Sequence, residues 1–147
     1  MTNKANILIA SCALIAMVSA FQMSIGAQGA KSVNDGAFTA DQAKKGAALY
    51  ADKCSPCHGE DLSGQAGIIP ALTGDPWLMN WNGKTVGDLY DKIFMTMPAL
   101  EPGSLKPEEA AALVANILNV MKYPAGSAEI APKAEANQGI KIEAPKK

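Results

Sequence analysis

The sequence predicts an all-α fold of three to four helices joined by long loops. Residues 40–53 and 107–121 carry small or apolar residues at helical spacing. Between His58 and Trp77 the chain is rich in glycine and shows no sustained strand alternation, and Met97–Pro107 contains three prolines and a glycine. Both of these segments are therefore expected to be loops.

The N-terminal segment has the pattern of an export signal. Lys4 precedes the uncharged apolar run Ile7–Phe21, which is short for a membrane span of about 20 residues. We expect residues 1–29 to be a signal peptide, or an anchor that is retained. The protein is then exported to the periplasm, and it contacts the membrane only if this segment stays attached. Residues 30–37 are expected to be a polar linker to a domain over 38–126.

Capping residues place the helices of that domain. Thr39 and Gln42 match a capping box, which predicts a helix from Ala40 to Lys53. Thr85 predicts the start of a helix that runs from Val86 to about Met95. Pro107, at a first helical position, begins the last helix, whose apolar stripe consists of Ala110, Leu113, Val114, Ile117, Leu118 and Met121.

The C-terminal tail, residues 127–147, is rich in alanine, lysine, glutamate and proline. It carries no periodic apolar face. Such a segment does not bury enough apolar surface to offset the entropy of ordering, so we expect it to be disordered.

Composition narrows the class of function. The formal net charge is −1, and the 13 basic residues are all lysines, so neither a nucleic-acid footprint nor a bidentate phosphate clamp is indicated. Only eight residues are aromatic, from 2 Trp, 3 Tyr and 3 Phe. The intrinsic core is therefore small, and an added group is expected to fill it.

The segment Cys54–His58, "CSPCH", holds the only histidine of the chain. A Cys-x-x-Cys pair serves a redox disulfide, a zinc site or covalent haem attachment. The redox disulfide needs a βαβ setting that is missing here, and zinc needs a fourth ligand that no further Cys or His after His58 supplies. Haem needs two thiols and an adjacent imidazole, so this pattern predicts one covalent haem c, with His58 on the iron.

A sixth iron ligand is expected from methionine, because no second histidine exists. The candidates after His58 are Met79, Met95, Met97 and Met121. Met121 lies on the apolar stripe of the last helix, where core packing is the simpler explanation. Met97 precedes Pro98 at the start of a loop, where the backbone can bend to direct a thioether, so we expect it to be the ligand.

Three stretches, "GAALYADKCSPCHG", "TMPALEPGSL" and the terminal helix, resemble the class I cytochromes c. The resemblance covers about residues 38–126. It implies a fold in which the first and last helices cross beside the haem, with the stripe through Val114, Ile117 and Leu118 packed against Gly46 and Tyr50.

The same resemblance implies roles for residues outside the Cys-x-x-Cys-His motif. The Pro70 carbonyl receives the Nδ1–H of His58, and Leu72 packs on the haem. The missing arginine leaves Trp77, Trp81, Asn82 and Lys84 as donors to the haem propionates. Trp81 is preferred among them, with a purely structural tryptophan as the alternative.

The function implied is that of a single-electron carrier and not of an enzyme, because histidine and methionine occupy both axial positions. The stretch "TMPALEPGSL" followed by "ALVANILNVMKYPAG" resembles small cytochromes c often found with bacterial quinoprotein alcohol dehydrogenases and respiratory chains. Redox proteins are the expected partners, with a periplasmic dehydrogenase or respiratory complex as donor and an oxidase as acceptor. Two alternatives remain open: an electron-accepting subunit of a larger oxidoreductase, and an open-site haem enzyme or sensor.

Overall fold

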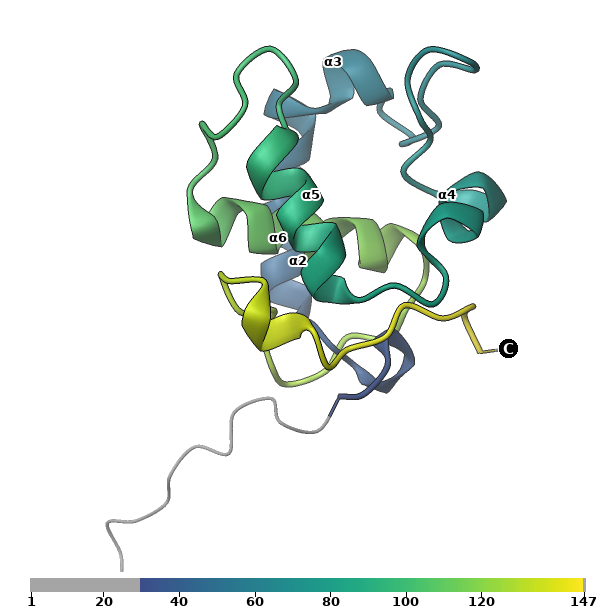
Figure 1. Ribbon diagram of the computed structural model, residues 1–147, viewed down its shortest axis with the longest axis vertical. Coiled ribbons are helices and arrows are strands. Elements are labelled where there is room, and N and C mark those ends of the chain that lie inside the picture. Colours follow the sequence, from purple (N-terminus) through teal and green to yellow (C-terminus); the bar gives the residue numbers. More distant parts are fainter. Residues whose placement is uncertain (1–29, 147) are drawn as a thin grey trace, which may run out of the picture.

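The computed structural model describes residues 30–146 and is helical throughout (Figure 1). Its helices are α2 (Ala40–Lys53), α3 (Ser55–His58), α4 (Gly74–Trp81), α5 (Val86–Thr96) and α6 (Pro107–Val120), with 3-10 turns η1 (Val33–Asp35) and η2 (Glu135–Asn137). Within this range three isolated β-bridges occur but no strand. The all-α prediction is confirmed.

Helices α2, α5 and α6 are the three that capping and periodicity predict. The Thr39 hydroxyl accepts the backbone N–H of Gln42 at 3.1 Å, and Thr85 and Asp88 form a reciprocal capping box at the start of α5. These side chains satisfy N–H groups that have no partner within the helix. Local signals of this kind were sufficient to place both helix starts.

Helix α4 begins inside the segment His58–Trp77 that was expected to be a loop, so that expectation is wrong over residues 74–77. The sequence "GDP" is typical of a turn. Here Asp75 and Pro76 instead occupy the first turn of a helix, where a proline breaks no intrahelical hydrogen bond and a carboxylate favours the helix dipole. The described residues thus hold five α-helices, where three to four were expected.

Helices α2 and α6 cross in close contact at Gly46. A Cβ atom at this position would lie 1.8 Å from the Ala112 carbonyl oxygen and 2.9 Å from Cβ of Asn116, so only glycine fits. The α6 atoms nearest to this position belong to Ala112 and Asn116, and the expected packing of Val114, Ile117 and Leu118 against Gly46 and Tyr50 stays a prediction. All nine residues from Ala110 to Leu118 are buried, because neighbouring segments cover every face of α6.

The C-terminal tail is ordered over residues 127–146, contrary to the expectation from sequence. Its residues Ile130, Ala134, Asn137, Ile140 and Ile142 are all buried. We call residues 127–146 the C-terminal strap. It runs along the end of the molecule opposite α3 (Figure 1). Disorder was predicted because no periodic face is visible, but an extended strap buries single residues and needs no such face.

Gln42 has a different partner from the one predicted. Instead of closing a capping box, its amide Nε2 donates to the Ile130 carbonyl and its Oε1 accepts the Ile130 N–H, both at 2.9 Å. One side chain thereby satisfies both backbone groups of a buried strap residue. This pair attaches the first part of the strap to α2.

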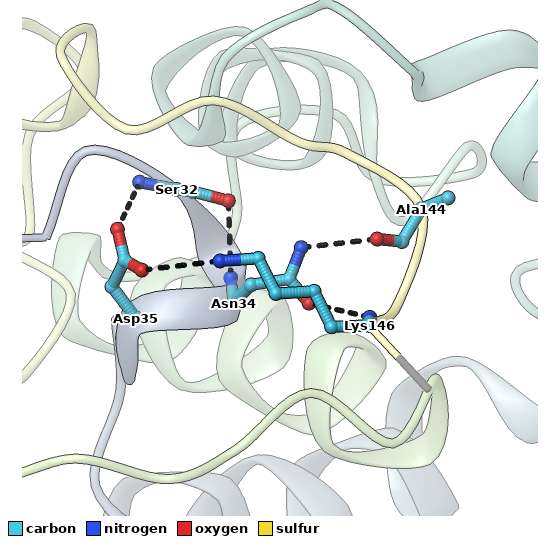
Figure 2. Close-up of polar contacts among 5 residues, drawn as sticks. All are labelled: Ser32, Asn34, Asp35, Ala144 and Lys146. Atoms are coloured by element: carbon cyan, nitrogen blue, oxygen red, sulfur yellow. Dashed lines mark hydrogen bonds and ion pairs between the residues drawn. The ribbon is translucent and has the colours of Figure 1, made fainter.

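Residues 30–37 also pack on the domain and are not a free linker. Val33 is fully buried, and its N–H donates to the Lys141 carbonyl at 2.9 Å. The side chain of Asn34 exchanges two hydrogen bonds of 3.0 Å with the backbone of Ala144 and Lys146 (Figure 2). Hydrogen bonds therefore join the first described segment, residues 30–37, to the end of the C-terminal strap. The predicted signal segment, 1–29, lies outside the described residues.

Within residues 30–146 no helix is long and apolar enough to cross a membrane.

Candidate haem-binding site

The Cys-x-x-Cys-His motif forms a single helical turn directly after α2. The Cys54 N–H donates to the Tyr50 carbonyl at 2.9 Å and ends α2. The N–H groups of Cys57 and His58 then donate to the Cys54 carbonyl, at 3.1 and 2.9 Å. Residues three and four apart on a helical turn share one face. The turn therefore presents both thiols and the imidazole to the same side.

His58 is buried, and its imidazole Nδ1 lies 3.0 Å from the Pro70 carbonyl oxygen. A carbonyl only accepts hydrogen bonds, so Nδ1 carries the proton in this contact and Nε2 is left with its lone pair. An imidazole in this tautomer is ready to bind a metal, and the carbonyl raises its basicity. This is the contact that the sequence analysis expects of Pro70.

The loop after His58 is folded tightly enough to hold that carbonyl in place. The Gly64 N–H donates to the His58 carbonyl at 2.8 Å, and the Leu72 N–H donates to the Leu62 carbonyl at the same distance. Gly64 has a φ of +67°, and a Cβ there would lie 2.4 Å from the Ile69 carbonyl oxygen. Glycine is required at this position.

The two cysteines are free thiols in different surroundings. Cys54 is half-buried and Cys57 is exposed. Burial raises the pKa of the Cys54 thiol to about 11, against a smaller opposing effect of Lys53. Both thiols are therefore available for attachment to a prosthetic group. Among residues 30–146, no group of three or more His, Cys, Asp and Glu side chains could hold a metal ion.

The surroundings of the methionines leave one good candidate for a sixth ligand. Met79 and Met95 point to solvent, at 79% and 63% exposed. Met121 is buried, as predicted, and its sulfur accepts hydrogen bonds from the Gly74 N–H at 3.1 Å and the Thr73 hydroxyl at 3.4 Å. No local pattern indicates this sulfur contact, because Thr73 and Met121 are 48 positions apart. Met97 is half-buried at the C-cap of α5.

The remaining predicted site residues, Leu72 and Trp81, are both half-buried and pack against the core. Trp81 stacks on Trp77 with ring centroids 6.4 Å apart, and the Lys84 ammonium lies 4.8 Å from the Trp81 ring centre. Trp77 is fully buried, and its Nε1–H has no hydrogen-bond partner. A buried donor without a partner costs roughly 1 to 3 kcal/mol, so Trp77 requires an acceptor.

Comparison with known proteins identifies the family. Residues 41–117 match the family described as cytochrome C oxidase, cbb3-type, subunit III. The chain belongs to this family. The resemblance to c-type cytochromes is thereby confirmed, and membership implies a covalently bound haem c.

One relative and one solved structure show how far the similarity extends. The chain is 34% identical over 79 residues to the cbb3-type cytochrome c oxidase subunit CcoP of Rubrivivax gelatinosus. These aligned residues are 53% of this chain and 23% of that protein. The chain therefore spans about a quarter of that relative. This chain also aligns with a chain in the crystal structure of the sulfane dehydrogenase SoxCD from Paracoccus pantotrophus. The alignment covers 73% of this chain and 60% of the SoxCD chain, at 24% identity and a TM-score of 0.49.

Proposed function

We propose that this protein carries single electrons on one haem c, attached through Cys54 and Cys57 and ligated by His58 and Met97. The observation that carries the proposal is the His58–Pro70 contact, at 3.0 Å. It fixes a buried imidazole with Nε2 free, on the same helical turn as two free thiols. A redox disulfide needs no oriented imidazole, and a structural zinc site needs a fourth ligand that no further Cys or His after His58 supplies.

The chain fits the haem in a second respect, through Trp77. The unpartnered Nε1–H is the donor that a haem propionate would satisfy. We therefore propose Trp77 as the propionate donor in place of Trp81, whose ring already contacts the Lys84 ammonium.

The haem, when bound, supplies the ferric–ferrous couple. The chain's own residues determine what that couple can do. Pro70 orients His58, Met97 would ligate the iron and so leave no position for a substrate or gas, and the buried residues of α5 and α6 would help to keep water from the haem. A thioether ligand raises the potential. The arrangement supports electron transfer without chemical change of a substrate.

The proposed partners are redox proteins. The family name supports an oxidase as the electron acceptor, and a periplasmic dehydrogenase of the quinoprotein type, or a respiratory complex, is the proposed donor. Because the matched relative is an oxidase subunit four times longer than the matched region, we propose as the second candidate an electron-accepting subunit held within a larger complex. Either role places the domain on the periplasmic side, after export directed by the N-terminal segment.

The ligand assignment predicts the effect of Met97→Ala. The variant should keep its covalent haem but lose the weak ferric band near the red end of the spectrum, and its midpoint potential should fall because the thioether that stabilises ferrous iron is gone. Spectra and potentiometric titration of the purified holoprotein measure both effects. Met95→Ala, which removes an exposed sulfur two residues away, is the matched control. A wild-type spectrum in Met97→Ala would refute the assignment.

The propionate proposal predicts a difference between two tryptophans. Trp77→Phe removes the donor and leaves a propionate charge less compensated, which favours ferric iron, so the midpoint potential should fall. Trp81→Phe, in the same stacked pair, should leave the potential nearly unchanged. Potentiometric titration of the two holoprotein variants distinguishes them. An equal fall in both, or a fall in Trp81→Phe alone, would contradict the assignment to Trp77.

A further inference from the structure

The second half of the C-terminal strap, residues 138–143, is bonded to the turn between α4 and α5. The carbonyls of Lys84 and Ile140 accept the N–H groups of Ile142 and Val86, each at 2.9 Å, and the Gly83 N–H donates to the Ile142 carbonyl at 2.8 Å. The Thr85 hydroxyl donates to the Gln138 amide oxygen at 2.7 Å. Two backbone bonds and one side-chain bond thus fix the turn of residues 82–85, and the third backbone bond fixes the first residue of α5.

The strap also closes on α5 itself. A Cβ at Gly87 would lie 2.6 Å from the Ala134 carbonyl oxygen and 2.7 Å from the Gln138 amide nitrogen, so no larger residue fits between helix and strap. The Ile140 carbonyl satisfies the first N–H of α5, which has no partner inside the helix. The side chain of Ile142, whose backbone is bonded to the turn, is fully buried.

Both helices joined by this turn carry a residue of the proposed haem site. Helix α4 carries Trp77, and α5 ends at Met97. The 11 residues of α5 make a rod about 16 Å long, so a tilt of about 4° at its start moves its end by about 1 Å. A displacement of that size is larger than the tolerance of about 0.5 Å that a functional constellation allows.

We propose that residues 138–143 act as a positioning element for the haem: by fixing the start of α5, they hold the Met97 sulfur within reach of the iron. This inference rests on the proposed function. The positioning element lies outside residues 41–117, where the chain matches its family.

The strap offers its own control. Ile130 and Ile142 are both isoleucines, 1% and 0% exposed. Ile130 is attached to α2 through Gln42, whereas Ile142 is bonded to the α4–α5 turn. Ile130→Ala and Ile142→Ala should therefore lower the melting temperature of the holoprotein to a similar extent. If the strap only stabilised the fold, both substitutions would change the imidazole affinity and the midpoint potential of the haem iron equally.

The test is a titration of the ferric holoproteins with imidazole, which competes with a thioether for the iron. Loss of the weak ferric band near the red end of the spectrum reports the exchange. The dissociation constant of imidazole should be about tenfold lower for Ile142→Ala than for wild type, a change of about one logarithmic unit. The midpoint potential of this variant should also fall. Ile130→Ala should match wild type in both. Where either alanine variant does not fold, Ile142→Val and Ile130→Val repeat the comparison with a smaller cavity.

Two results would overturn the inference: equal imidazole affinities in the two variants, or a greater effect in Ile130→Ala. Failure of the proposed function gives a different result, since the ferric band would then be absent from the wild type or insensitive to Met97→Ala.

Discussion

Replacing Cys54 and Cys57 together with alanine should give a chain that carries no covalent haem and does not fold cooperatively. The helices are short, and two of the residues proposed to contact the haem, Leu72 and Met97, are only half-buried in the protein chain alone. A haem packed against them would complete their burial, at roughly 25 cal/mol per Å² of apolar surface. Without it, part of the core faces water.

The loss should be measured by thermal unfolding, followed by far-ultraviolet circular dichroism, on variants produced in cells that attach haem c. We expect no sharp transition in the double variant. Ser55→Ala changes a side chain in the same turn, where the Ser55 hydroxyl donates to the Ala51 carbonyl, and it should retain both haem and transition. A cooperative transition near the wild-type temperature in the cysteine variant would show that the haem is not part of the core.

Deleting residues 127–147, which include the whole C-terminal strap, should destabilise the holoprotein strongly. The deletion removes the buried Ile130, Ile140 and Ile142, and truncating an isoleucine in a core costs roughly 2 to 5 kcal/mol even when the backbone stays. It also leaves the Gln42 amide and the Val86 N–H without partners. The combined loss is comparable with the whole stability of an ordinary domain, roughly 5 to 15 kcal/mol.

The expected result is a fall in melting temperature of at least about 20 °C, at the few degrees per kcal/mol that apply to small domains. Deletion of residues 145–147 alone is the control, because it leaves the buried isoleucines and the Asn34–Ala144 bond intact. If the variant that lacks residues 127–147 has the melting temperature of the wild type, the strap does not stabilise the fold as described.

The elements that the sequence predicted correctly are those defined by neighbouring residues. Thr39 and Thr85 each cap a helix through a contact three positions away. The structure adds the distance of 3.0 Å between His58 and Pro70, a contact that the family resemblance, and not the local pattern, implied.

The strap and α4 could not be predicted in this way, because their causes lie far along the chain. The Gln42–Ile130 pair spans 88 positions, and neither partner is unusual in its own segment. Three isoleucines in a tail otherwise rich in lysine and alanine were the one available signal. They do not form a sustained apolar face, but a buried extended segment needs none.

The choice of Trp81 over Trp77 shows the same limit. Both indoles lie in α4, and sequence alone cannot tell which Nε1–H lacks a partner. The structure distinguishes them, since Trp77 is fully buried with an unpartnered donor, and comparison of Trp77→Phe with Trp81→Phe tests the choice between them.

The central claim is that both axial positions of the haem iron are occupied, so that the protein transfers electrons without binding a substrate. Carbon monoxide binding to the dithionite-reduced wild-type holoprotein tests this most directly, because the gas needs an open position on ferrous iron. The account predicts no change in the wild-type haem spectrum over minutes under carbon monoxide, and rapid conversion in Met97→Ala. Rapid conversion of the wild type would contradict the account and indicate an open-site haem enzyme or sensor.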